Sequence, residues 1–217
     1  MYHIKEMFYS LQGEGAHTGR PAIFLRFSGC NLWNGKESHR QNSICTFCDT
    51  DFIGTNGING GKFDTAQDLA NHVNKIWPNN DRLNKYVICT GGEPALQLDN
   101  ALLDALHEFN FEVGIETNGT LPLPENLDWI CVSPKGSSDV VIKTCNELKL
   151  VFPQSNCLPE RFTGINADLR YLSPLNDPSS SHLNPSMEPN TKACIEYCLN
   201  HPEWRLCLQT HKILNIE

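Results

Sequence analysis

The 217-residue sequence contains no apolar run that approaches the roughly 18 residues needed to cross a membrane. Its first residues, Met1–Met7, also lack the charged and then apolar layout of a secretory signal. No tract is dense in Lys or Arg, and 17 basic residues against 25 acidic ones give a formal net charge of −8. We therefore expect a cytoplasmic protein with no membrane or nucleic-acid partner and with a small molecule as its substrate.

An internal repeat and a long linker are missing as well, so residues 1–217 are expected to form one domain. Helical patterns occur at Asp64–Trp77, around Leu102–Leu106 and at Thr191–Leu199, and Pro174–Pro189 has the composition of a loop. Strands that alternate with helices predict an α/β fold with mostly parallel strands. Because a complete eight-fold barrel takes about 250 residues, we expect a truncated, open TIM-like barrel. The β-rich apolar stretches are Ala22–Phe27, Tyr86–Cys89, Glu112–Ile115, Trp129–Val132, Glu147–Phe152, Leu169–Leu172 and Trp204–Gln209.

Cysteine, by contrast, is abundant, with ten residues in the chain. Thiols stay reduced in the cytosol, so such a count indicates metal binding or catalysis rather than disulfides. Not all ten need a chemical role. Cys89, Cys131 and Cys207 lie inside apolar runs and are expected to be small core residues.

Three other cysteines carry the clearest chemical signal. Cys30 follows the strand predicted at Ala22–Phe27, and after a gap of fourteen residues Cys45 and Cys48 form a Cys-x-x-Cys pair. Three thiolates on a four-iron cluster leave one iron open for a ligand with amino and carboxylate groups. The pair alone also suits a thioredoxin-like redox loop, or a structural zinc ion whose fourth ligand would be His39 or a distant cysteine.

A glycine-rich turn adds to this signal. The strand Tyr86–Cys89 runs into Thr90–Pro94, which reads Thr-Gly-Gly-Glu-Pro. Two glycines at the carboxyl end of a strand let the backbone approach a ligand closely, and Glu93 adds an acceptor for an ammonium group. Taken alone, the segment is also compatible with a tight turn. Together with the cysteines, it favours an iron–sulfur site over a zinc site.

With these motifs the chain resembles the radical S-adenosylmethionine superfamily and, within it, the family of 7-carboxy-7-deazaguanine synthases. The resemblance extends from Glu6 to the last residue. The superfamily's usual cysteine spacing is Cys-x3-Cys-x2-Cys, whereas the first gap here is fourteen residues. This departure is similar to one subgroup of the synthases that has an insertion, here residues 31–44, in the cluster segment. The motifs that carry the resemblance are Ser10–Gly15, Arg26–Asn31, Cys48–Asp51, Thr90–Pro94, Glu116–Gly119, Ser133–Lys135 and Gln209–Lys212.

The resemblance implies three cofactors: a 4Fe–4S cluster on Cys30, Cys45 and Cys48, S-adenosylmethionine, and a magnesium ion at the Thr50 hydroxyl. Mg²⁺ often keeps several waters, so a site with few protein ligands is physically acceptable. Taken singly, each implied residue is also an ordinary turn residue, but barrel-like sites gather at the ends of successive strands. The residues implied to bind S-adenosylmethionine are Phe47, Cys48, Asp49, Gly92, Glu93, Thr117, Asn118, Ser133, Pro134, Lys135, Ser173, Pro174, Leu175 and Asn176.

The implied substrate is 6-carboxy-5,6,7,8-tetrahydropterin. Glu14 is suited to its amino group, Arg26 offers a planar fork for its carboxylate, and His211 is suited to bonding it or to moving a proton. Without the family, Arg26 reads equally well as a strand-end ion pair and His211 as a surface histidine. The residues implied to bind the substrate are Leu11, Gln12, Gly13, Glu14, Arg26, Thr90, His211 and, at the end of the chain, Glu217.

The resemblance also implies a reaction, catalysed by a carbon–nitrogen lyase. A 5′-deoxyadenosyl radical removes a substrate hydrogen, the pterin ring contracts and ammonia leaves, which gives 7-carboxy-7-deazaguanine on the path to queuosine-type nucleosides. The enzyme would be a homodimer that receives electrons from a flavodoxin or ferredoxin. Two alternatives stay open: a radical activase of a partner protein, which gives no role to Gln12, Glu14 and His211, and a non-catalytic binding module stabilised by zinc.

Overall fold

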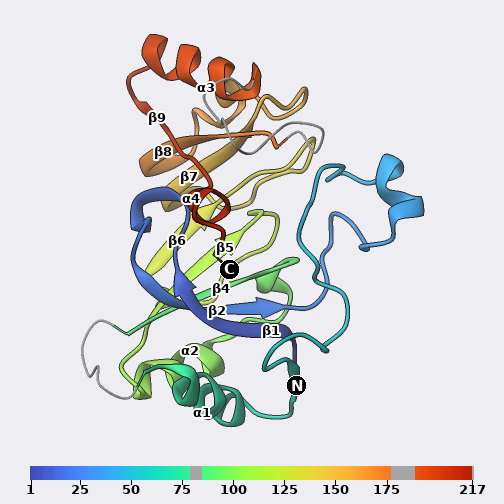
Figure 1. Ribbon diagram of the computed structural model, residues 1–217, viewed down its shortest axis with the longest axis vertical. Helices are drawn as coiled ribbons and strands as arrows, with labels where there is room; N and C mark the ends of the chain where they lie inside the picture. Colours follow the sequence, from blue (N-terminus) through green and yellow to red (C-terminus); the bar gives the residue numbers. More distant parts are fainter. Residues whose placement is uncertain (79–84, 177–188, 217) are drawn as a thin grey trace.

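The computed structural model describes residues 1–78, 85–176 and 189–216. Its described strands form a nine-stranded sheet in the order β3-β1-β2-β4-β5-β6-β7-β8-β9. Figure 1 shows this sheet running the length of the molecule. The strands are β1 (Tyr2–Leu11), β2 (Pro21–Phe27), β3 (Gly61–Phe63), β4 (Tyr86–Gly91), β5 (Glu112–Thr117), β6 (Trp129–Val132), β7 (Thr144–Phe152), β8 (Asn166–Pro174) and β9 (Trp204–Leu206).

Every neighbouring pair from β2 to β9 is parallel, while β1 runs antiparallel to both β2 and β3. The strand order begins at β3 and ends at β9, so the described strands form an open sheet and not a closed barrel. The predicted α/β fold, an open and partial TIM-like barrel, is therefore confirmed. In such a sheet the carboxyl ends of the parallel strands meet at one edge, where ligands bind.

Helices cover the two ends of the sheet, with α1 and α2 together at one end and α3 at the other (Figure 1). Hydroxyl and carboxylate caps begin the first two: Thr65 accepts the Asp68 backbone N–H, and Asp99 accepts that of Leu102. None of the described helices is long and apolar enough to cross a membrane. The helices are α1 (Ala66–Ile76), α2 (Asn100–Glu108), α3 (Pro189–Asn200) and α4 (Thr210–Leu214), with shorter 3₁₀ turns η1 (Gly15–His17), η2 (Glu37–Asn42), η3 (Pro94–Leu96) and η4 (Pro159–Phe162).

Two hydrophobic clusters hold the layers together. The larger one packs α1 and α2, through residues such as Leu69 and Leu102, against the strands β1, β2, β4 and β5. The second packs α3, through Cys194, against β7, β8 and β9. Full burial of one such leucine stabilises the fold by roughly 1.5–3 kcal/mol. Cys89, Cys131 and Cys207 are all buried, as predicted.

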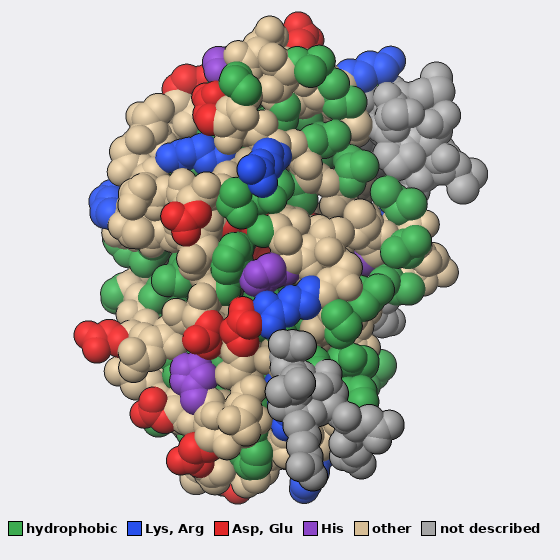
Figure 2. All heavy atoms as spheres, turned by 90° about the vertical axis from the view of Figure 1, so that its left-hand side faces the viewer, with side chains coloured by type: hydrophobic (Ala, Val, Ile, Leu, Met, Phe, Trp, Pro, Cys, Tyr) green, Lys and Arg blue, Asp and Glu red, His purple; other side chains and the backbone are tan. Residues whose placement is uncertain are grey.

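The outer surface carries both signs of charge. On the face that Figure 2 shows, acidic and basic side chains are interspersed among apolar and uncharged ones over the coloured atoms. This face therefore presents no continuous basic area among the described residues.

Two strands of the structure, β1 and β3, were not expected from the sequence, and a third strand ends earlier than expected. The strand β1 was not expected, because charged residues interrupt its apolar pattern. The strand expected at Trp204–Gln209 ends at Leu206, since the chain then turns into α4. Residues 31–44, which were expected to be an insertion of unspecified conformation, contain the exposed 3₁₀ turn η2. Most of the loop expected at Pro174–Pro189 lies outside the described residues.

Candidate active site at the carboxyl edge of the sheet

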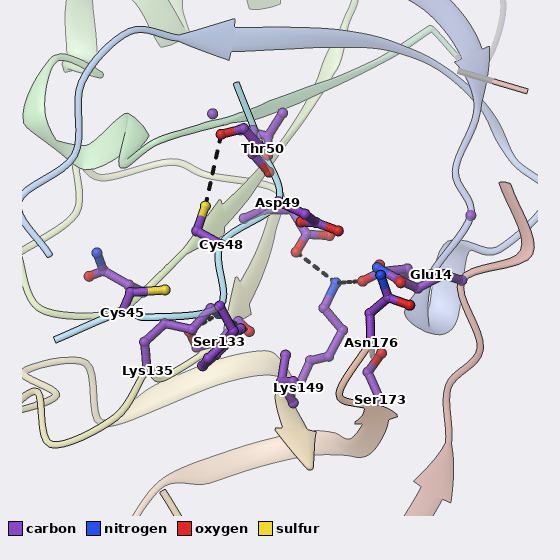
Figure 3. Close-up of a pocket in the computed structure, with 18 of the residues that line it drawn as sticks. Glu14, Cys45, Cys48, Asp49, Thr50, Ser133, Lys135, Lys149, Ser173 and Asn176 are labelled. Carbon is purple, nitrogen blue, oxygen red and sulfur yellow. Dashed lines mark hydrogen bonds and ion pairs between the residues drawn. The ribbon is translucent and has the colours of Figure 1, made fainter. Parts of the chain in front are cut away.

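A cavity of about 330 Å³ opens at the carboxyl edge of the parallel strands. It is lined by all the residues assigned to the site from the sequence except Glu93 and Pro134, which lie behind its wall, and Glu217, which lies outside the described residues. Figure 3 shows two of the cysteines at one end and Glu14 with Lys149 at the other. The lining residues that were not assigned are Phe8, Phe24, Leu32, Gly91, Glu116, Lys149, Val151, Gln209 and Lys212.

The three cysteines meet at the first end of this cavity. Cys30 lies in the loop after β2, where its sulfur accepts the Leu32 backbone N–H at 3.4 Å, and burial raises the pKa of its thiol. A hydrogen bond from Cys45 lowers the pKa of Cys48 to about 6, while the same contact raises that of Cys45. Thiolates are the ligands of iron–sulfur clusters, so this donor set fits a cluster with three protein ligands.

Within residues 1–78, 85–176 and 189–216, no group of three or more His, Cys, Asp and Glu side chains is gathered closely enough to hold a single metal ion. A four-iron cluster spreads its ligands over separate irons and does not require such a gathering.

Arg40 supports the turn that carries Cys45 and Cys48. Its guanidinium donates to the carbonyl oxygens of Cys48 at 2.9 Å and Thr46 at 3.3 Å. The same group lies 4.0 Å from the centre of the Trp33 ring and pairs with Glu37 at 2.8 Å. Arg40 thus fastens the segment that presents Cys45 and Cys48.

Two glycines bring the loop of Cys30 against the end of β4. Gly91 has a φ of 132°, which side-chain-bearing residues rarely adopt. A Cβ on Gly92 would lie 2.0 Å from the Gly29 carbonyl oxygen, so only glycine fits there. The Glu93 backbone N–H then donates to that same carbonyl at 2.8 Å.

The Glu93 side chain is fully buried and holds the neighbouring strand end. Its carboxylate accepts hydrogen bonds from the Ala95 N–H at 2.9 Å, the Thr117 hydroxyl at 2.7 Å and the Asn118 N–H at 2.8 Å. Burial raises its pKa, an effect that these donors oppose. Glu93 therefore fixes Thr117 and Asn118, which line the cavity, while its own carboxylate lies behind them.

The next strand ends supply further polar groups to the wall. Lys135 bonds both the carbonyl and the hydroxyl oxygen of Ser133 at 2.6 Å, and Asn118 donates to Asn31 in the cysteine loop at 2.9 Å. Ser173 at the end of β8 is buried beside the cavity. Pro134 instead turns its carbonyl toward the Cys157 thiol.

A charged group closes the far end of the cavity. The Lys149 ammonium lies 2.8 Å from both the Glu14 and the Glu116 carboxylates. Burial alone raises the pKa of Glu14, but Lys149 and the amide of Gln209 outweigh it and lower this pKa to about 2. Gln12 joins the group by donating to Glu116 at 3.2 Å.

Arg26 and Thr90 face the cavity side by side, because β2 and β4 pair them in register. The Arg26 guanidinium also pairs with Glu6 at 2.7 Å, as the ion-pair interpretation of this residue expected. Thr50 lines the cavity on the cysteine side, and the neighbouring Asp51 pairs with Lys5 at 2.7 Å.

The C-terminal residues complete the wall. Thr210 donates to the Gly13 carbonyl from both its backbone N–H and its hydroxyl, each at 2.9 Å. A Cβ on Gly13 would lie 2.2 Å from the His211 ring, so the glycine makes room for the histidine. Burial lowers the pKa of His211, which favours the neutral ring, and Lys212 pairs with Asp49 at 2.7 Å.

Comparison with known proteins places these features in context. The sequence model described as the Radical SAM superfamily matches residues 40–150. The chain is 52% identical to the 7-carboxy-7-deazaguanine synthase of Bradyrhizobium diazoefficiens over 216 residues, 99% of each chain, and 52% identical to that of Caulobacter vibrioides over 217 residues, also 99% of each. A solved structure, titled as the crystal structure of QueE from Escherichia coli, matches with a TM-score of 0.69 and 27% identity, and covers 96% of this chain and 93% of that one.

Proposed function

The chain belongs to the 7-carboxy-7-deazaguanine synthase family of the radical S-adenosylmethionine superfamily, and on that premise we propose that it converts 6-carboxy-5,6,7,8-tetrahydropterin to 7-carboxy-7-deazaguanine with loss of ammonia. The product serves queuosine-type 7-deazapurine biosynthesis. One observation carries the proposal: a single cavity joins the three cysteines to the hydrogen-bonding group around Glu14.

The cysteine end of the cavity is suited to the cofactors. Cys30, Cys45 and Cys48 would hold the 4Fe–4S cluster, with the strand-end residues from Gly92 to Asn176 around S-adenosylmethionine. When bound, these cofactors supply a carbon-centred radical that abstracts a hydrogen atom from the substrate. The Thr50 hydroxyl would hold a magnesium ion next to the substrate carboxylate.

The opposite end is suited to a pterin. The ionised Glu14 carboxylate accepts hydrogen bonds from an amino group, and the backbone at Leu11 and Gly13 adds further hydrogen-bonding groups. Arg26 presents its guanidinium to a carboxylate, with the Thr90 hydroxyl beside it. His211, held neutral by burial, both donates and accepts and thereby is able to hold or move a proton at the substrate ring.

The oligomeric state, the cellular location and the electron donor are inferred from the family. We propose a homodimer in the cytoplasm that receives its electron from a flavodoxin or ferredoxin. A radical activase would leave the group around Glu14 without a role, since a protein substrate needs no small acceptor-rich end to the cavity. A zinc-stabilised module gains no support from the described residues.

One anaerobic assay tests the proposed function. Protein reconstituted with iron and sulfide is incubated with the carboxypterin, S-adenosylmethionine and a reductant, and the product is identified by mass. We expect 7-carboxy-7-deazaguanine; its absence despite an intact cluster would reject this substrate, and a bound zinc without a brown cluster chromophore would reject radical chemistry.

Cysteine variants check the cluster ligands in the same assay. Cys48→Ala removes one thiolate ligand, so both the cluster and turnover should be lost. Cys198→Ala is the matched control, because Cys198 lies on α3 away from the cavity, and it should retain both. Full activity of Cys48→Ala would contradict the assignment.

A further inference from the structure

A buried lysine lies at the end of the cavity that is remote from the cysteines (Figure 3). Lys149 comes from the middle of β7, and only 5% of its surface is exposed. Its ammonium lies 2.8 Å from one oxygen of Glu14 and 2.8 Å from one oxygen of Glu116. A buried ammonium is costly unless it is paired and hydrogen-bonded, so the two carboxylates are the reason that this lysine is tolerated there.

Glu116 connects Lys149 to Gln12, because it contacts both side chains. The second oxygen of Glu116 accepts the Gln12 side-chain amide at 3.2 Å. The Gln12 carbonyl oxygen therefore points the other way, where it accepts the backbone N–H groups of Gly13 at 2.8 Å and Glu14 at 3.3 Å. The orientation of the amide is thus set by a neighbour that Lys149 itself holds.

Glu14 is held from a second side by the C-terminal segment. The Gln209 amide donates to the oxygen of Glu14 that Lys149 does not contact, at 2.8 Å. Each carboxylate oxygen has accepted one hydrogen bond from the protein and retains capacity for another. Together, one positive and two negative groups leave an excess of acceptors at this end of the cavity.

We propose that Lys149 is a positioning residue for substrate binding, which holds Glu14 directly and Gln12 by way of Glu116 so that both face the donor-bearing edge of the pterin ring. This inference rests on the proposed function. It assigns a role to a residue that has no direct part in the radical chemistry, and it makes the recognition of ring N–H and amino groups depend on one ammonium.

The affinity for the carboxypterin should report this role. Removing the ammonium takes away a hydrogen bond between charged groups and leaves two carboxylates facing each other, so Lys149→Met should weaken carboxypterin binding by about ten- to a hundredfold. Binding of S-adenosylmethionine should stay unchanged, because its implied residues lie at other strand ends. Lys143→Met removes an exposed lysine just before the same strand and serves as the matched control.

The pH dependence of binding adds a readout that a merely structural role would not move. The charged or titratable groups around Glu14 and Lys149 are Glu116, Glu147, His211 and the thiols of Cys131 and Cys207. Without the ammonium, burial and the charge of Glu116 raise the pKa of Glu14. Relative to wild type, Lys149→Met should therefore lose affinity for the carboxypterin more steeply as the pH falls from about 8 to about 6.

A double variant separates the loss of binding from a loss of folding stability. Lys149→Met combined with Glu116→Gln removes the facing carboxylate, so it should melt at a higher temperature than Lys149→Met and still bind the carboxypterin weakly. The dissociation constants of carboxypterin and S-adenosylmethionine are measured separately on anaerobically reconstituted protein. Wild-type affinity of the double variant for the carboxypterin, or equal weakening of both ligands, would overturn the role of Lys149. Failure of the wild-type protein itself to bind or convert the carboxypterin would instead overturn the proposed function.

Discussion

Replacing Glu93 by glutamine tests whether this buried carboxylate holds the carboxyl edge of the sheet together. It accepts three hydrogen bonds of 2.7 to 2.9 Å, from Ala95, Thr117 and Asn118. A glutamine side chain has one acceptor oxygen, so its NH₂ group must face at least one of these donors. Because the site is fully buried, the donor left without a partner costs its desolvation.

The magnitude follows from the geometry. The least costly orientation turns the new NH₂ toward Asn118, since the other oxygen accepts two of the three hydrogen bonds. This removes a hydrogen bond to a charged group, about 1.5–3 kcal/mol, and leaves a buried N–H unpaired, about 1–3 kcal/mol. Burial raises the pKa of Glu93, so glutamine avoids part of the desolvation cost that the ionised carboxylate carries. We expect a net loss of about 3 kcal/mol and a melting temperature lower by about 6–12 °C.

Thermal melting followed by circular dichroism measures the effect, with Glu108→Gln as the control. Glu108 is exposed at the end of α2, so the same chemical change there should leave the melting temperature nearly unchanged. The dissociation constant of S-adenosylmethionine is measured beside it. Equal melting temperatures for the two variants would refute the structural role of Glu93, and weaker ligand binding in Glu93→Gln alone would then leave it only the proposed contact with S-adenosylmethionine.

Two further predictions concern the two ends of the cavity. Arg40→Ala should speed proteolysis of the segment before Cys48 by about tenfold, because a stacked guanidinium and its hydrogen bonds to two carbonyl groups are lost. Arg205→Ala, an exposed change on β9, should not; equal cleavage of the two variants would contradict the support from Arg40. Glu14 has its pKa lowered from 4.5 to about 2, so it contributes roughly 3 kcal/mol of stability above pH 4.5 that is lost as the pH falls toward 2. In Glu14→Gln the free energy of unfolding should therefore fall less steeply with decreasing pH in that range. Urea titrations at several pH values measure this free energy, and the same pH dependence in the variant and in wild type would count against the lowered pKa.

The sequence was most informative where a residue's role is local. Glycines at a strand end, cysteines after a strand and a carboxylate after Gly92 can be recognised without knowing which strands are neighbours. Their meeting in one cavity follows from the parallel order of the sheet, which brings successive strand ends to one edge. This is why the fold class and most of the lining residues could be predicted together.

Residues whose role depends on register were missed. Lys149 and Glu147 are charged residues inside the apolar stretch Glu147–Phe152, and that anomaly was the available signal. Nothing local indicates that Lys149 meets Glu14, which lies far away in the chain and reaches the cavity after the antiparallel strand β1. The position of Glu93 behind the wall likewise depends on its contacts with β5.

The open edge of the barrel explains why the C-terminal segment belongs to the site. In a closed barrel the last strand would pair with the first, but the described sheet ends at β9 and at β3. Side-chain contacts span this gap instead: Cys207 accepts the Gly15 N–H at 3.1 Å, Thr210 bonds the Gly13 carbonyl, and Lys212 pairs with Asp49 beside the cysteines. Since these contacts reach both the acceptor-rich end and the cysteine end, the segment after β9 ties the two ends of the cavity together. In this open barrel the segment after β9 therefore lines the site at the place where a closed barrel would have further strands.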